Sequence, residues 1–191
     1  MDTYDALQQA VTSTEKIVAG VKAGQLDEAT PCTEWNVRQL LNHVVSAMGL
    51  GAALLTDTTP EHPSPPGGLP DVDLVGDDPS AAYQRAAEAL LAAAGTKGAL
   101  DAGHETPLGD MPGAVVGGIL TLDVLVHGWD LARATGQDVA FDADLTTHVL
   151  GFAGQAIQPE MRDGGLVGPV VAVDSTAPVL DQLVGHMGRT P

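Results

Sequence analysis

The stretch AVVGGILTLDVLVHGWDLARA, residues 114 to 134, decides the fold because it is apolar on nearly every side. A surface helix has one apolar face, whereas a helix that is apolar all round belongs inside a protein. We therefore predict a central, buried helix over about residues 114–134. Gly136 follows it in the position where glycine ends many helices. Other helices must cover this one, which indicates a helical bundle.

Apolar residues at helical spacing predict further helices on both sides of the central one. The second helix begins cleanly, because Asn36 is a good N-cap and Gln39 stands where a capping box needs it. The third has Asp78 as its N-cap and Pro79 at its first position. We expect an all-α fold with helices over about residues 3–22, 36–55, 79–94, 114–134, 142–158 and 177–187, and one short strand at 170–173. No internal repeat is visible.

The segment from Thr58 to Asp77 contains five prolines and the pair Gly67-Gly68. Proline removes helix donors and glycine favours turns, so we predict a long surface loop that is not part of the core. Residues 95–113 are also predicted to be irregular. The two helices before the loop are too few to form a core, so we place no boundary there. One domain is expected over residues 1–191.

Composition restricts the partners and the compartment. The 25 acidic residues outnumber the 8 Lys and Arg, and a net charge of −17 repels nucleic-acid phosphates and anionic membranes. The N-terminus lacks the basic and apolar regions of a signal peptide, and the single cysteine, Cys32, excludes an internal disulfide. We expect a cytoplasmic protein that acts on a small molecule. The sequence leaves open whether it forms a homodimer.

An acid and a histidine interrupt the apolar central helix. Asp123 and His127 are four residues apart, so both side chains project from the same helix face. A carboxylate buried there without a partner would cost several kcal/mol. On the second helix, His43 lies on an apolar stripe with Leu40 and Ala47. Bundles build metal sites from facing helices, so we predict a divalent-metal site at His43, Asp123 and His127.

Two imidazoles and one carboxylate suit Zn²⁺ with an open fourth position, and they also suit Ni²⁺ or Fe²⁺. The spacing alone leaves a second interpretation open, in which the histidines are hydrogen-bonded core residues and the Asp–His pair is a helix contact. We expect His62, His104, His148 and His186 to lie outside the site. No basic residue close in sequence activates Cys32, which we interpret as a small buried apolar residue rather than a reactive thiol.

Three blocks of sequence carry a resemblance: TPCTEWNVR followed by LNH (residues 30–38 and 41–43), LVHGWDLA (125–132) and GRTP (188–191). With them the chain resembles the DinB/YfiT-like metal-binding proteins, in the branch related to the metal-binding domain of mycothiol-dependent maleylpyruvate isomerase. The resemblance implies a four-helix bundle with additional C-terminal helices. It also implies that the family's metal triad falls on His43, Asp123 and His127.

The resemblance has two departures. The isomerase has glutamate where this chain has Asp123, and it continues into a second domain that contributes to its site. Maleylpyruvate isomerisation is therefore not carried over. Asp130 would be able to hold a histidine ring nitrogen, but we favour a helix contact or an ion pair with Arg133 for it, and a core position for Trp129.

Three functions follow from these expectations. The first is a transferase or isomerase in which the ion binds a thiol such as mycothiol as cosubstrate and presents it to a small electrophile. The second is a metal-dependent hydrolase of a small molecule. The third is a non-catalytic, stress-related metal-binding protein. The sequence does not separate them.

Overall fold

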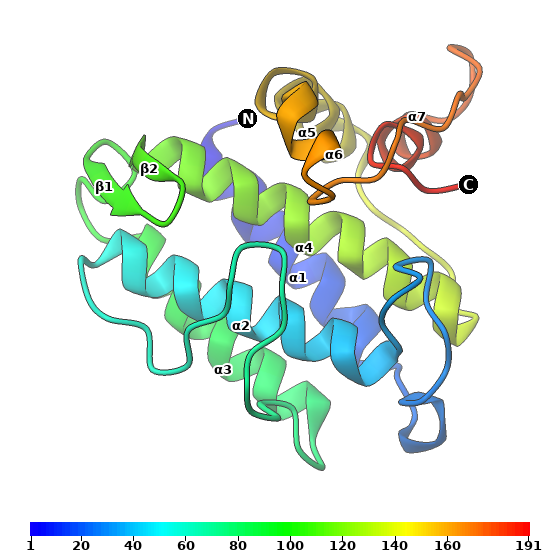
Figure 1. Cartoon of the computed structure of the whole chain (residues 1–191), viewed down its shortest axis with the longest axis horizontal. Helices are drawn as coiled ribbons and strands as arrows, with labels where there is room; N and C mark the ends of the chain where they lie inside the picture. Colours follow the sequence, from blue (N-terminus) through cyan, green and yellow to red (C-terminus); the bar gives the residue numbers. More distant parts are fainter. The chain divides into compact units, whose positions relative to one another are not determined.

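A computed structural model describes all 191 residues, which form two compact units, Asp2–Val139 and Ala140–Pro191, with Met1 grouped with the second. The prediction of one domain over residues 1–191 stays a prediction. The first unit contains four long helices that pack together, as Figure 1 shows. They are α1 (Thr3–Ala19), α2 (Val37–Leu55), α3 (Pro79–Ala94) and α4 (Gly113–Thr135), with a 3-10 turn at Ala23–Gln25 after α1.

α2 and α3 begin where a local side chain supplies a cap. Asn36 Oδ1 accepts from the backbone N–H of Gln39, whose side chain accepts from the Asn36 N–H in return. Asp78 caps α3 in front of Pro79. At the C-terminal end of α4, Gly136 adopts φ +67°, a left-handed conformation that costs glycine little. These predicted helix ends are confirmed.

α4 packs against α1 and α2, and α3 packs against the same two helices. The buried Thr14 hydroxyl on α1 donates to the carbonyl of Val124 on α4, at 3.1 Å. Tyr83 on α3 is fully buried, and its hydroxyl donates to the Val11 carbonyl on α1 at 3.0 Å. Each buried hydroxyl thereby finds a partner, as burial of a polar group requires.

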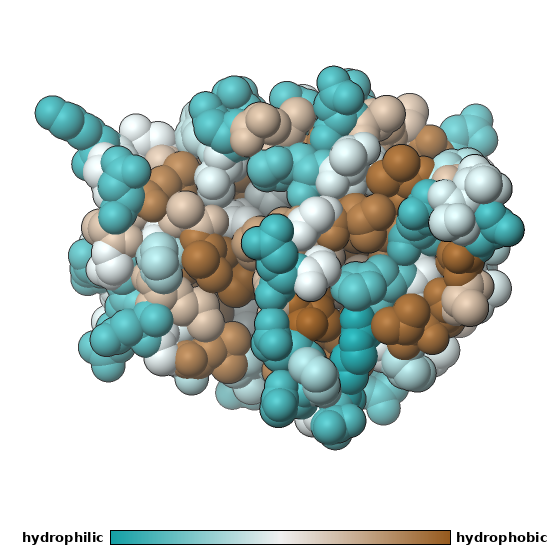
Figure 2. All heavy atoms as spheres, turned by 90° about the horizontal axis from the view of Figure 1, so that it is seen from above, coloured by the Kyte–Doolittle hydropathy of each residue, from teal (hydrophilic) through white to brown (hydrophobic).

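One helix, α4, is long and apolar enough to cross a membrane, but 72% of its most apolar window is buried inside the protein. Burial of this extent is typical of a core helix, as the sequence predicted. On the face drawn in Figure 2, hydrophilic and hydrophobic side chains are interspersed. The large apolar residues that remain exposed are scattered along the chain: Met1, Val72, Leu108, Leu166 and Val170.

The strict all-α prediction is wrong between α3 and α4. Two short antiparallel strands, β1 (Gly103–Thr106) and β2 (Gly109–Pro112), form a hairpin where the sequence predicted irregular turns. Gly109 at the turn has φ +100°, which only glycine adopts without strain. The hairpin leads directly into α4, whose first residue donates its N–H to Ala102 O at 2.7 Å.

The second unit contains α5 (Ala143–Ala156), the short α6 (Pro159–Asp163) and α7 (Val179–His186), with α5 packed against α7. Asp142 caps α5 as predicted. The strand expected at 170–173 is not formed. Val171 donates one backbone hydrogen bond to Gly185, and no neighbouring strand offers the ladder that a strand needs.

The segment from Thr58 to Asp77 is irregular, as predicted, but it is anchored to α2. Asn42 is buried, and its Oδ1 accepts the N–H of Leu74 at 2.6 Å while its Nδ2 donates to Asp73 at 3.0 Å. Arg38 forms an ion pair with the same aspartate at 2.9 Å. Val75 is buried in the core, so the expectation that the whole loop lies outside the core is wrong.

Candidate metal centre

The structure brings the three predicted ligands together. His43 from α2 points at Asp123 from α4, with 3.2 Å between His43 Nε2 and Asp123 Oδ1. His127, one turn further along α4, places its own Nε2 3.4 Å from the same oxygen. The two imidazoles meet edge to face with their centroids 5.0 Å apart. Ligand atoms of all three residues therefore lie within 4.8 Å of one another.

Each histidine is held through its other ring nitrogen. Nδ1 of His43 lies 2.8 Å from the carbonyl oxygen of Gly68, and Nδ1 of His127 lies 3.0 Å from Oδ2 of Asp130. A carbonyl only accepts and a carboxylate accepts, so both Nδ1 atoms carry the hydrogen. In a neutral ring this leaves the Nε2 lone pair free, and metal-binding histidines are oriented in the same manner.

The surroundings of Asp123, like the orientation of the two histidines, indicate that a cation can bind here. Its Oδ2 is buried without any hydrogen-bond partner, while its Oδ1 faces both Nε2 atoms. Three acceptors facing one another need positive charge between them, either protons on the rings or a metal ion. The donor set therefore fits a divalent ion, which would take the two Nε2 atoms and the carboxylate.

Without an ion, protons have to supply this charge. Burial acts to raise the pKa of Asp123, but the neighbouring His43 and His127 charges outweigh burial and lower that pKa below its usual range. Burial acts to lower the pKa of His127. The Asp123 charge and the hydrogen bonds of the ring with Asp123, Asp130 and Cys32 outweigh burial and hold the pKa of His127 well above its usual range. A metal ion must displace protons from the site.

Trp35, in the loop before α2, covers one side of the centre. Its ring centroid lies 4.7 Å from that of His43 and 6.2 Å from that of His127. The loop is held by Thr30, whose hydroxyl donates to the Trp35 carbonyl at 2.8 Å, and by a bridge between Ala29 and Asn36. From the sequence, Trp35 stood out only as part of the TPCTEWNVR motif. Its place over the histidines depends on tertiary packing.

Three further residues, two on α4 and one in the loop before α2, can be compared with their interpretation from the sequence. Asp130 is fully buried, and its Oδ2 lies 3.0 Å from Nδ1 of His127, three residues earlier on the same helix. The sequence pattern favours another helix contact or an ion pair with Arg133 over this histidine contact. Trp129 is a core residue as expected, with the guanidinium of Arg133 5.5 Å from its ring. Cys32 is only partly buried, and it hydrogen-bonds His127. The apolar interpretation of Cys32 is therefore wrong.

None of the remaining histidines joins the triad. His104 is buried on β1, between Asp57 Oδ1 at 3.0 Å and Ala99 O at 2.7 Å. His62 is exposed in the loop after α2. In the second unit, His148 is exposed on α5. The backbone carbonyl of His186 accepts a hydrogen bond from the Arg162 guanidinium at 2.9 Å.

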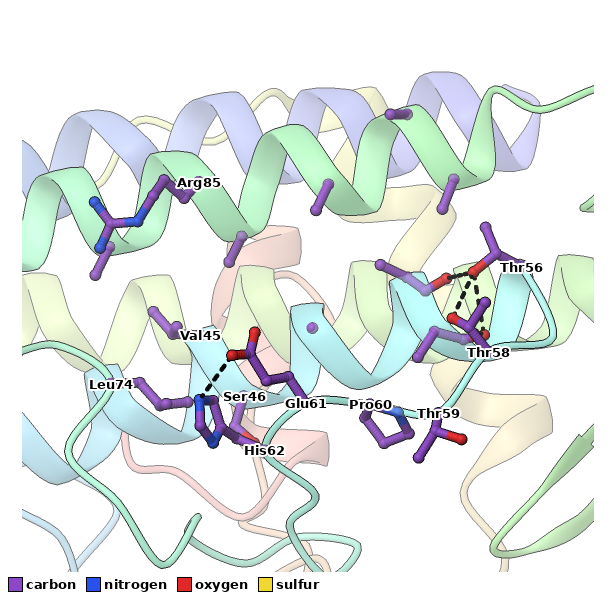
Figure 3. A pocket seen from close by; sticks show the side chains of 18 residues that line it. Val45, Ser46, Thr56, Thr58, Thr59, Pro60, Glu61, His62, Leu74 and Arg85 are labelled. Carbon is purple, nitrogen blue, oxygen red and sulfur yellow. Dashed lines mark hydrogen bonds and ion pairs between the residues drawn. The ribbon is translucent and has the colours of Figure 1, made fainter.

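A separate cavity of about 720 Å³ lies between α2 and α3, and Figure 3 shows it. None of the three ligands lines it. Small residues of the two helices form its walls, the loop residues Pro60, Glu61 and His62 form one rim, and Arg85 extends from α3. The loop after α2 thus borders this cavity and, through Gly68, also anchors His43.

Comparison with known proteins identifies the family of the chain. The sequence profile of the family described as "Mycothiol maleylpyruvate isomerase N-terminal domain" matches residues 7–132, which contain all three predicted ligands. The chain is 35% identical over 194 residues to uncharacterized proteins of Mycobacterium tuberculosis strains CDC 1551 and H37Rv, covering 100% of this chain and 99% of each relative. No solved structure matches. The suspected relation is confirmed: the chain belongs to the family of mycothiol maleylpyruvate isomerase N-terminal domains.

Proposed function

We propose that the protein binds one divalent ion of the Zn²⁺ type at His43, Asp123 and His127 and uses it to transfer or isomerise a small electrophile with a low-molecular-weight thiol. Mycothiol is the proposed thiol, because the family is described by its use of mycothiol. The observation that carries the proposal is the orientation of both imidazoles toward the Asp123 carboxylate, whose Oδ2 is buried without a hydrogen-bond partner.

The chain's own residues prepare the site for this role. Gly68 O and Asp130 hold the two rings by their Nδ1 hydrogens, so that both Nε2 atoms stay directed inward. Trp35 lies against His43 and shields it from water. Three protein ligands leave one position of a tetrahedral ion open, and an ion there would supply a Lewis acid that keeps a thiol ionised near neutral pH.

Cobalt spectroscopy tests the proposal directly. Co²⁺ bound to a thiolate absorbs by sulfur-to-metal charge transfer, whereas Co²⁺ bound only to nitrogen and oxygen does not. The measurement uses the Cys32→Ser protein, so that any sulfur signal comes from the added thiol. We expect mycothiol to produce the band at neutral pH, and an analogue with oxygen in place of sulfur to produce none.

The matched control is the Cys32→Ser, His43→Ala protein, which lacks one ligand and should show no band with mycothiol. If the Co²⁺-loaded Cys32→Ser protein shows no spectral change with excess mycothiol or a simpler thiol, the thiol-dependent function is wrong. Hydrolysis of a small molecule and non-catalytic metal binding would then take its place. Assays with ester and amide substrates would separate those two.

A further inference from the structure

His127 lies between two groups of ligand atoms rather than one. On its Nε2 side are Asp123 and His43, the donor set described above. On its Nδ1 side is Asp130, and the Cys32 thiol also hydrogen-bonds this imidazole. Ligand atoms of Cys32, His127 and Asp130 also lie within 4.8 Å of one another.

The two carboxylates stand in matching positions around the ring. Asp123 precedes His127 by four residues and Asp130 follows it by three, so both lie on the face of α4 that carries the imidazole. Whichever ring nitrogen holds an ion, the other is left with a hydrogen and a carboxylate to receive it. The helix therefore supports either neutral tautomer of His127.

We propose that Cys32, His127 and Asp130 form a second metal-binding donor set, which takes a thiophilic divalent ion and shares His127 with the first set. The ion would bind Cys32 Sγ, His127 Nδ1 and an Asp130 oxygen. The Nε2 hydrogen of His127 would then be donated to Asp123 Oδ1, 3.4 Å away. One neutral imidazole holds one ion, so the two sets are alternatives and the chain binds one ion at a time.

The chemistry of the second set differs from that of the first. Thiolate is a soft ligand, so this set favours Zn²⁺, Co²⁺ or Cd²⁺ over Mg²⁺ and Mn²⁺. The metal-free imidazole holds a hydrogen on each ring nitrogen, so it releases its Nδ1 hydrogen to solvent when the ion binds there and becomes neutral with the Nε2 hydrogen retained. The thiol loses its proton to solvent as the sulfur–metal bond forms. Cys32 is partly exposed, which leaves the sulfur accessible to an entering ion.

The backbone around Cys32 holds the thiol in place before any ion arrives. The Cys32 carbonyl accepts from the Trp35 N–H at 2.8 Å and from the Thr30 hydroxyl at 3.0 Å. These bonds use main-chain atoms of Cys32 and do not depend on its sulfur. Substitution of the sulfur by oxygen in Cys32→Ser therefore preserves the loop while removing the proposed soft ligand.

The test uses Co²⁺ alone, without added thiol, and the His43→Ala protein, which lacks a member of the first set only. We expect this variant to bind about one Co²⁺ per chain and to show a sulfur-to-cobalt charge-transfer band. His43→Ala combined with Cys32→Ser should lose that band and the binding. Cys32→Ser by itself should bind Co²⁺ through the first set without the band, and His127→Ala should bind at neither set.

Asp123→Asn gives an independent variant if His43→Ala fails to fold, as judged by circular dichroism. It removes the carboxylate of the first set, while the amide oxygen still accepts from His127 Nε2. Binding of Co²⁺ by these two variants without a charge-transfer band, or no binding by either folded variant, would overturn the proposal. A negative result in the thiol titration of the Cys32→Ser protein would not contradict the second donor set, because that experiment tests only the first set.

Discussion

Oδ2 of Asp130 lies 3.0 Å from Nδ1 of His127, and Asp130 has no exposed surface. The carboxylate therefore fixes the direction in which His127 offers its other nitrogen. Carboxylates behind metal-bound imidazoles typically contribute a factor of about 10–100 to metal affinity. The relationship makes Asp130 a positioning residue of the first donor set.

We predict that Asp130→Asn in the Cys32→Ser background weakens Zn²⁺ binding by roughly 10–100-fold, because a neutral amide holds the imidazole less firmly. Competition with a chelator of known affinity measures the change. His148→Gln, at an exposed residue of the second unit, is the control and should bind as the parent does. Equal affinity of the Asp130→Asn and parent proteins would show that the hydrogen bond does not position the ligand.

The loop after α2 provides a second prediction through Asn42, whose amide bonds Leu74, Asp73 and Arg38 O. Asn42→Ala removes three hydrogen bonds to partly buried or exposed partners, and each such bond contributes about 0.5–1.5 kcal/mol of folding free energy. It should also loosen Gly68 and so weaken metal binding. Chemical denaturation and protease susceptibility of residues 58–77 measure both effects.

Ser64→Ala is the matched control in the same loop. It removes one hydroxyl bond to Ser46, at 2.8 Å, and should cost only about 1 kcal/mol. If Asn42→Ala is no more destabilising than this change, the loop is not anchored to α2 in the manner described.

The third prediction concerns pH and His104, which has an acceptor at each ring nitrogen. The Ala99 carbonyl and then the Asp57 carboxylate favour the protonated ring and raise the pKa of His104, although burial opposes them. A group whose pKa is raised by folding stabilises the fold fully below its unfolded value of about 6.5. That contribution is lost as pH rises through the folded pKa.

The unfolding free energy of the parent should therefore exceed that of His104→Gln most at about pH 5 to 6, and the difference should shrink at higher pH. Urea denaturation of both proteins across this range measures it. Asp57→Asn should lower the pH at which the difference declines. A difference that is constant with pH would contradict a charged His104.

The fourth prediction concerns two glycines. A side chain at Gly113 would collide with the carbonyl oxygen of Ala99 and with Leu100 Cα, and backbone atoms cannot move aside. Overpacking of this kind costs about 1–3 kcal/mol, so Gly113→Ala should lower the thermal midpoint. Gly49 lies inside α2 with open space around its Cα, so Gly49→Ala should stabilise the protein by about 0.5–1 kcal/mol. Calorimetry of both variants tests the pair.

The parts of the fold that the sequence predicted well depend on local interactions. The caps at Asn36 and Asp78 act within one turn, and the apolar run of α4 needs no knowledge of its neighbours. The hairpin β1–β2 was missed because four-residue strands are stabilised by pairing across the turn. The predicted strand at 170–173 was wrong for the same reason, since its valines have no pairing partner.

The candidate site likewise contains residues that local sequence patterns predicted and one residue that they missed. Asp123 and His127 share a helix face by spacing, and His43 follows from the apolar stripe of α2. The structure places the three together, while metal binding itself stays a prediction. Cys32 was missed because its contact with His127 arises from the fold of the loop, and a polar neighbour in space leaves no mark in the adjacent sequence.

The ring of Trp35 over His43 also gives the protein a built-in optical reporter. The chain has two tryptophans, and Trp35 is the one whose centroid lies 4.7 Å from a proposed ligand. A paramagnetic ion such as Co²⁺ or Ni²⁺ bound to His43 should quench the emission of this indole, whereas diamagnetic Zn²⁺ should not. Fluorescence can therefore follow the arrival, exchange and departure of ions in real time, without any attached dye.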